Sequence, residues 1–147
     1  MSQRKTILTY LTDTLFPTIT TTNGYNFTLG RIARDIESQE QLSGSQYPAV
    51  FVAGADEDYA NVTKLDFLSD MTVFIIGYVK ASDQSVQQQM DNLIEDIQKA
   101  LGVDLTQGGR VAYTSPRKLT TYQGDSYSHG SFIMEVVFRY KQPWATP

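Results

Sequence analysis

Histidine is the side chain most often used as a general base near neutral pH, and the sequence contains one, His129. Asp125 and Ser131 lie close to it in the sequence, so the residue types of a hydrolytic triad occur together. In a working triad the acid orients the base, the base contacts the nucleophile, and the three come from separate elements. One polar segment does not show that geometry. We therefore interpret His129 as a solvated loop residue and predict no catalytic residue.

A second group could bind a metal, because Asp56, Asp58 and Asn61 resemble the start of a calcium-binding loop. The EF-hand pattern needs glycine at its sixth place and glutamate at its twelfth, and these places hold Asn61 and Phe67. We interpret residues 56–58 as an acidic solvated loop, with a weak divalent site as the minor alternative. Gly108-Gly109-Arg110 matches no phosphate-binding motif, so we expect no cofactor.

Charge and composition argue against several kinds of ligand and partner. The chain has 147 residues, a formal net charge of −4 and no cysteine, which excludes disulfides and thiolate metal sites. Its basic residues form only short pairs, which we interpret as solvated strand faces or interface salt bridges rather than a nucleic-acid surface. These pairs are Arg31 with Arg34, Arg117 with Lys118, and Arg139 with Lys141.

The first half of the chain predicts one helix and several strands. Apolar residues at helical spacing indicate a helix from Ile7 to Phe16, which Pro17 ends. Strands are expected at Asn26–Ile36 and Pro48–Gly54, separated by a polar loop at Glu37–Gln46. Met71–Tyr78 is apolar on both alternating faces, which is typical of a strand in the middle of a sheet, and its Gly77 is expected to leave room for a neighbour.

The second half predicts a long amphipathic helix followed by two strands. The helix is expected at Asp83–Leu101, with Ser82 or Asp83 as N-cap and Gly102 after its end. A strand at Arg110–Tyr113, interrupted by Pro116 and resumed at Lys118–Tyr122, is followed by a polar loop and a last strand. That loop is Gln123–Gly130, the last strand is Ser131–Lys141, and the tail Gln142–Pro147 is expected to extend away from the sheet.

This order of elements predicts the α+β class: a single domain with a mainly antiparallel mixed sheet and two helices packed on one face. The second helix could instead be a crossover between parallel strands. The N-terminal residues lack a signal-peptide core, and the longest mostly apolar run, Met71–Val79, is too short to span a bilayer. We therefore expect no membrane partner.

The order and spacing of these elements resemble the tail terminator, or tail completion, proteins of long-tailed bacteriophages. The stretches that carry the resemblance include Tyr47-Pro48-Ala49-Val50-Phe51-Val52 and Asp104-Leu105-Thr106-Gln107-Gly108-Gly109. The long strand Met71–Lys80 leading into the helix Asp83–Leu101, and the final strand Phe132–Tyr140, complete the pattern. The resemblance covers most of the chain.

The resemblance implies a non-enzymatic virion protein, made in the bacterial host cytoplasm, whose single domain spans residues 1–147. Such proteins form a ring, typically a hexamer, that caps the tail tube, ends its polymerisation and joins the tail to the head connector. The implied partners are copies of the chain itself, the tail tube protein, the head–tail connector protein and, in contractile tails, the sheath protein. DNA would pass through the lumen without specific binding, and the net charge of −4 favours an acidic lumen.

Two other functions remain open: a different phage neck, head-closure or baseplate component, and a small-molecule-binding or enzymatic α+β domain. For self-assembly we expect contacts from exposed aromatic and apolar residues in the loops and tail. The candidate contact residues are Trp144, Tyr140, Tyr127, Leu42 and Tyr47.

Overall fold

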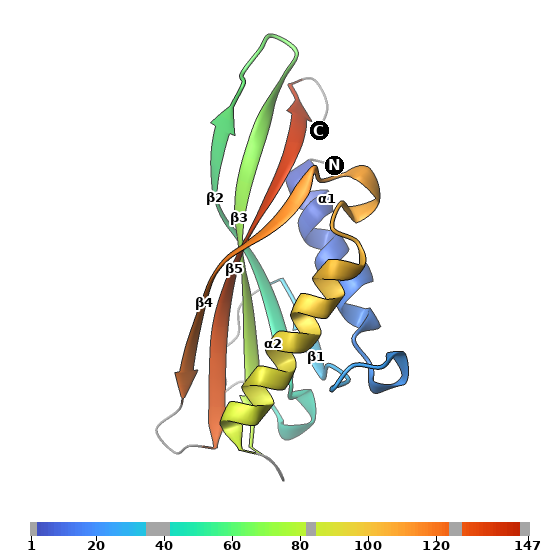
Figure 1. The fold of residues 1–147 in the computed structure, drawn as a ribbon, viewed down its shortest axis with the longest axis vertical. Helices are drawn as coiled ribbons and strands as arrows, with labels where there is room; N and C mark the ends of the chain where they lie inside the picture. The colour runs from blue at the N-terminus through green and yellow to red at the C-terminus, as the bar shows by residue number, and fades with distance from the viewer. Residues whose placement is uncertain (1–2, 35–41, 82–84, 124–127, 145–147) are drawn as a thin grey trace.

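The computed structural model describes residues 3–34, 42–81, 85–123 and 128–144. Its centre is a five-stranded sheet in the order β1-β2-β3-β5-β4, in which β1 is parallel to β2 and every other pair is antiparallel. Both helices cover the same face of this sheet (Figure 1). The α+β prediction, with two helices on one face of a mainly antiparallel sheet, is confirmed.

The helix layer buries one face of the sheet. Helix α1 (Gln3–Tyr10) continues as a wider turn through Leu15 and ends in a 3₁₀ turn that contains Pro17, close to the predicted stop. Helix α2 (Val86–Val103) begins later than predicted, because Ser85, rather than Ser82 or Asp83, is its N-cap. The Ser85 hydroxyl accepts a hydrogen bond from the Gln88 backbone N–H at 3.2 Å, which satisfies one of the helix's free donors.

The sheet is long because three of its strands are long. Strand β2 (Ala49–Ala60) forms a hairpin with β3 (Asp66–Lys80), and β3 pairs along its whole length with β5 (His129–Pro143). Strand β3 is the middle strand of the sheet, as predicted for its apolar stretch Met71–Tyr78. Its neighbour β5 pairs in turn with the edge strand β4 (Tyr113–Gln123), whose bulge lies between Pro116 and Lys118.

Strand β1 (Arg31–Ala33) is much shorter than the predicted Asn26–Ile36. The reason is that Asn26 and Phe27 donate their backbone N–H groups to the Asp96 carboxylate of α2, at 2.9 and 3.0 Å. These donors are therefore not available to a strand ladder, and residues 35–36 lie outside the described residues.

Two other predicted boundaries are wrong. Residues 56–58 belong to β2 rather than to an acidic loop, because the sheet continues past the bulge between Gly54 and Glu57. At the C-terminus, Gln142 and Pro143 stay in β5 and pair with Phe67 and Asp66, so this part of the tail does not leave the sheet. Residues 145–147 lie outside the described residues.

Glycines mark close approaches within the sheet, as predicted for Gly77. A Cβ built on Gly77 would lie 2.3 Å from the Phe132 ring, so only glycine leaves room for this buried aromatic side chain. A Cβ on Gly30 would lie 2.6 Å from the Gln46 backbone, which explains why the chain entering β1 has glycine there. At these two positions neighbouring atoms can pack closely because glycine has no side chain.

Candidate functional site

The hairpin of β2 and β3 projects beyond the helix layer (Figure 1). Several apolar side chains at and near its end are exposed. Exposed fractions are 61% for Tyr59, 61% for Val62, 80% for Leu65 and 58% for Trp144. Together with Phe67 we call these residues the hairpin-tip cluster. Single exposed apolar residues are ordinary, but several of them at one end of a domain indicate an interaction surface.

The aromatic rings of this cluster form a continuous row. The Tyr59 and Phe67 rings meet edge to face, with centroids 5.0 Å apart, and the Phe67 and Trp144 centroids are 4.6 Å apart. These distances lie in the range of favourable aromatic pairs. The row therefore presents a surface built from three rings that support one another.

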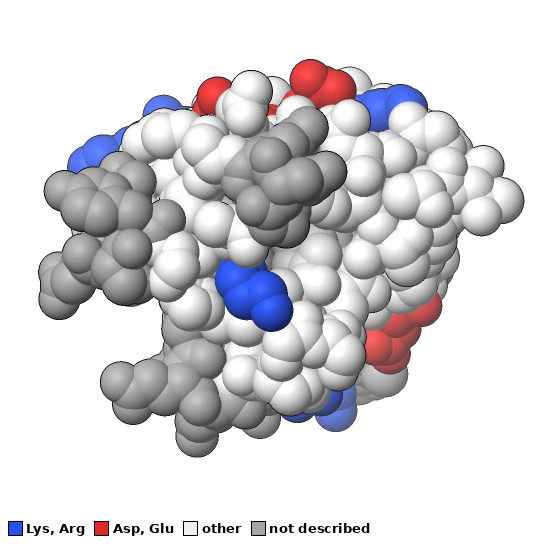
Figure 2. All heavy atoms as spheres, turned by 90° about the horizontal axis from the view of Figure 1, so that it is seen from below, with Lys and Arg blue, Asp and Glu red and all other residues white. Residues whose placement is uncertain are grey.

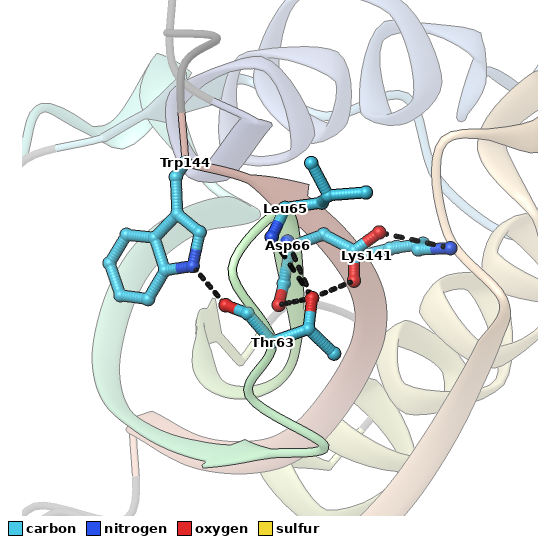
Figure 3. Close-up of polar contacts among 5 residues, drawn as sticks. All are labelled: Thr63, Leu65, Asp66, Lys141 and Trp144. Carbon is cyan, nitrogen blue, oxygen red and sulfur yellow. Dashed lines mark hydrogen bonds and ion pairs between the residues drawn. The ribbon is translucent and has the colours of Figure 1, made fainter.

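Trp144 is held in place by the loop that joins the hairpin strands (Figure 3). Its indole Nε1–H donates to the Thr63 carbonyl oxygen at 2.8 Å, and its backbone N–H donates to the Leu65 carbonyl oxygen at 3.1 Å. These two bonds fix the side chain on the hairpin. The predicted contact residue Trp144 is thus exposed, but it is part of the sheet's end and not of a detached tail.

The loop itself is tightly organised. The Thr63 hydroxyl oxygen accepts hydrogen bonds from the backbone N–H groups of Leu65 and Asp66, at 3.1 and 3.0 Å. The Thr63 N–H donates to the Asp66 carbonyl at 2.8 Å, and Lys141 forms a salt bridge with the Asp66 carboxylate at 3.1 Å. A surface that is already ordered loses little conformational entropy when it binds a partner.

A polar network supports the base of the hairpin. The Glu57 carboxylate accepts hydrogen bonds from Arg4 of α1 at 2.7 Å and from the Tyr140 hydroxyl of β5 at 2.9 Å. Arg4 also donates to the Ala55 carbonyl at 3.0 Å. The network joins the hairpin to both the helix layer and the strand beyond β3.

Tyr140 is consequently not a surface contact, and its prediction as an assembly residue is wrong. Its side chain is 2% exposed within its own domain, because the alternation of β5 turns it toward the helices. Burial, with the bond to Glu57 as the next cause, raises the pKa of the Tyr140 phenol well above its usual range. Tyr140 therefore acts as a neutral hydrogen-bond donor beneath the hairpin.

The remaining predicted contacts do not join the hairpin-tip cluster. Tyr47 and Leu42 belong to the segment that leads into β2, at the opposite end of the sheet from Trp144. Leu42 is partly buried against a small apolar group on the face of the sheet opposite the helices, which includes Phe51 and Ile76. Tyr127 lies outside the described residues. The structure thus separates Trp144 from Tyr47 and Leu42, which lie at the other end of the sheet.

Tyr47 borders a shallow pocket of about 220 Å³ at that opposite end. The Lys80 ammonium lies 5.8 Å from the centre of the Tyr47 ring, and the His129 ring centroid is 5.6 Å from it. Figure 2 views the molecule from this end and shows mostly uncharged atoms, with basic atoms near the middle. The pocket is lined by Phe27, Gly44, Tyr47, Pro48, Val79, Lys80 and Gln89.

The residues considered for catalysis do not form a triad in the described structure. His129 is the first residue of β5 rather than a loop residue, and its Nδ1 lies 2.9 Å from the Ser128 hydroxyl. Asp125 lies outside the described residues, and Ser131 faces Tyr78 and Tyr122 across the sheet. Among residues 3–34, 42–81, 85–123 and 128–144, no three histidine or acidic side chains are grouped to hold a metal ion.

No pattern in the sequence predicts the hairpin-tip cluster. Tyr59, Val62 and Leu65 are scattered among polar residues and match neither a helical nor a strand period. Only the hairpin, with Trp144 folded onto it, brings them together.

None of the helices in the described part of the chain could span a membrane. Comparison of the sequence with known protein families gave no match, and neither did comparison with curated protein sequences.

Proposed function

We propose that this protein is a structural subunit that works by assembling with copies of itself. The observation that carries the proposal is the hairpin-tip cluster. Three aromatic rings in contact and two exposed aliphatic side chains, Val62 and Leu65, are held rigidly at a projecting end of the sheet. Covering such a surface with a neighbour removes apolar area from water, which is the main favourable term in protein association.

More specifically, we propose a tail terminator of a long-tailed bacteriophage, present in the virion at the junction of tail and head. A ring of copies, six by analogy with the family that the sequence resembles, would cap the tail tube and offer its other face to the head connector. The α+β fold, with both described α-helices on one face of the sheet, agrees with this proposal. DNA would pass through the lumen without specific binding, in keeping with the net charge of −4.

The test is the size and shape of the purified protein. Light scattering over a wide concentration range should show a species several times the mass of the 16.5 kDa chain, and negative-stain images should show closed rings. If rings form only at the end of a tube, the protein should instead bind polymerised tail tubes and stop their growth. A chain that stays monomeric in both assays would refute the proposal.

A phage neck, head-closure or baseplate component is the nearest alternative, since such a protein would also self-assemble. Its position in assembled particles distinguishes it: gold-labelled antibody would mark the head connector side or the distal tail end.

The pocket beside Tyr47 favours a second candidate function, a small-molecule-binding domain. An exposed lysine, Lys80, next to an aromatic ring could recognise a small anion. If a small anionic metabolite bound to the monomeric protein and the Lys80→Ala variant lost this binding, the result would favour a small-molecule-binding domain over a structural subunit.

A further inference from the structure

Two margins of the sheet lack a strand partner. Strand β4 is the last strand in the order, and no described strand pairs with its outer margin. On the other side, β1 pairs only with Ala49–Phe51 of β2, so the rest of β2, from Val52 to Ala60, has no described strand on its outer margin. Open margins present backbone N–H and C=O groups that can template pairing with another chain. On β2 the Ala55 carbonyl already accepts a hydrogen bond from Arg4.

The two margins carry opposite charge. Arg117 and Lys118 are exposed on β4, while Asp56 and Asp58 are exposed on β2. No salt bridge joins any of these four side chains to another residue of the described segments. Each margin therefore holds a pair of exposed charges that form no salt bridge within the described residues, although Arg117 also attracts the Asp70 carboxylate at longer range.

The strand directions suit pairing between copies that have the same orientation. Strand β2 is antiparallel to β3, β3 to β5, and β5 to β4, so β4 runs opposite to β2. When two copies stand side by side in one orientation, β4 of the first is antiparallel to β2 of the second. This is the more favourable of the two ladder geometries.

The charged pairs also lie at similar heights along the strands. Lys118 is level with Phe74 of β3, through the ladder of β4, β5 and β3, and Asp56 lies in the β2 bulge opposite Thr72. Phe74 and Thr72 are two residues apart, which is about 7 Å along a strand. A lysine or arginine side chain can bridge that offset.

Pairing of like margins is disfavoured. Two β4 strands together would place Arg117 and Lys118 of one copy beside the same residues of the other, and two β2 strands would do the same with Asp56 and Asp58. Like charges placed opposite each other across a ladder are destabilising. The missing N–H of Pro116 and the adjacent bulge also restrict which registers β4 can adopt.

We propose that β4 of one copy pairs antiparallel with the exposed half of β2 of a second copy, with Arg117 and Lys118 facing Asp56 and Asp58. This inference rests on the proposed self-assembly and names the surface through which neighbours join. The contact is head to tail, because different surfaces of the two copies meet. Repetition of such a contact gives a closed ring when the rotation per copy closes, and a filament when it does not.

The test uses two variants with reversed charges. Arg117→Glu with Lys118→Glu makes both margins acidic, and Asp56→Lys with Asp58→Lys makes both margins basic. Each variant alone should need at least about tenfold more protein for half-assembly than the wild type, because like charges would face each other. An equimolar mixture should assemble again, with the two variants alternating, so its rings should contain an even number of subunits.

The control is Asp91→Lys, which reverses an exposed charge on α2 that lies on neither margin. It should assemble like the wild type, and circular dichroism should show all variants folded. If both reversed variants assemble like the wild type, or if their mixture stays dispersed, the margin pairing is wrong while self-assembly through other surfaces stands. If the wild type never assembles, in solution or on tail tubes, the proposed function itself fails.

Discussion

Replacing Trp144 with alanine separates the two roles of this side chain, in the folded monomer and in the assembly. An aromatic side chain buries about 150–250 Å² when fully covered, so the exposed 58% corresponds to roughly 90–140 Å². At ~25 cal/mol per Å², and after roughly 0.5 kcal/mol for ordering, covering this area contributes about 2–3 kcal/mol per contact. Trp144→Ala should therefore weaken assembly about 30- to 150-fold.

The monomer should lose much less than the assembly. The variant removes one hydrogen bond to the Thr63 carbonyl, worth about 1 kcal/mol net, and one aromatic pair with Phe67, worth about 0.5–1.5 kcal/mol. We expect the free energy of unfolding, measured by urea denaturation, to fall by about 1.5–2.5 kcal/mol. Trp144→Phe keeps an aromatic ring without the N–H donor and should be intermediate in both measurements.

The assay can use Trp144 itself, because the chain contains a single tryptophan. If a neighbour covers the indole, the wild-type emission should shift to shorter wavelength as the concentration rises and light scattering reports assembly. Leu105→Ala is the matched control, since it truncates a half-exposed apolar side chain outside the hairpin-tip cluster. The reasoning fails if Trp144→Ala assembles at the wild-type concentration, or if the wild-type emission is the same in both states.

Three further predictions concern the fold. Asp96→Asn should lower the free energy of unfolding, measured in urea, by about 1–3 kcal/mol. The reason is that both carboxylate oxygens of Asp96 accept backbone N–H groups, and the single amide oxygen of asparagine can replace only one of them. An unchanged midpoint of urea unfolding would contradict this. The hydrogen bond from Arg139 lowers the pKa of the Asp70 carboxyl in the folded protein. The stability that this pair contributes is therefore fully present above the pKa of the unfolded chain, near 3.8. It is lost as the pH falls through the lower pKa of the folded state. Thermal melting from neutral to acid pH should show that loss, and Asp70→Asn should remove its share. Gly77→Ala should cost about 1–3 kcal/mol, since its methyl group would overlap the Phe132 ring; a neutral effect on melting would refute the close packing.

The elements that bury apolar side chains at a regular period could be predicted from the sequence. The stripe of α2, from Val86 to Leu101, and the two apolar faces of β3 need no knowledge of neighbouring elements, because burial alone dictates their pattern. Gly77 could also be interpreted correctly, since a glycine inside a central strand usually marks a bulge or a close approach of neighbouring atoms.

The errors occur where a distant residue decides the local structure. The end of β2 looked like an acidic loop, because Asp56, Glu57 and Asp58 have low strand propensity. Arg4, which lies 53 positions earlier, forms a salt bridge with Glu57 in this strand. In the same way, Asp96 takes the backbone donors that would have lengthened β1. No local pattern contains these partners.

The candidate site was even less accessible to sequence reasoning. Trp144 could be chosen because a tryptophan near a terminus is an unusual feature, but its neighbours Tyr59 and Phe67 come from two other strands. The aromatic type of Tyr140 alone suggests a contact residue, yet the alternation of β5 places it inside the domain. Exposure depends on where the helix layer ends, and this is a property of the packed domain.

The position of Tyr140 gives this buried residue a different part in the proposed assembly. A projecting hairpin would be a poor binding surface if it moved freely, because ordering it would cost free energy at each contact. Glu57 anchors the hairpin's base by accepting hydrogen bonds from Arg4 of the helix layer and from Tyr140 of β5. The Glu57 carboxylate therefore links the hairpin that carries the proposed assembly surface to Tyr140 in the core of the monomer. Strand β2 contributes Tyr59 to the hairpin-tip cluster and also carries the acidic margin with Asp56 and Asp58, so one hairpin can engage a neighbour through both surfaces.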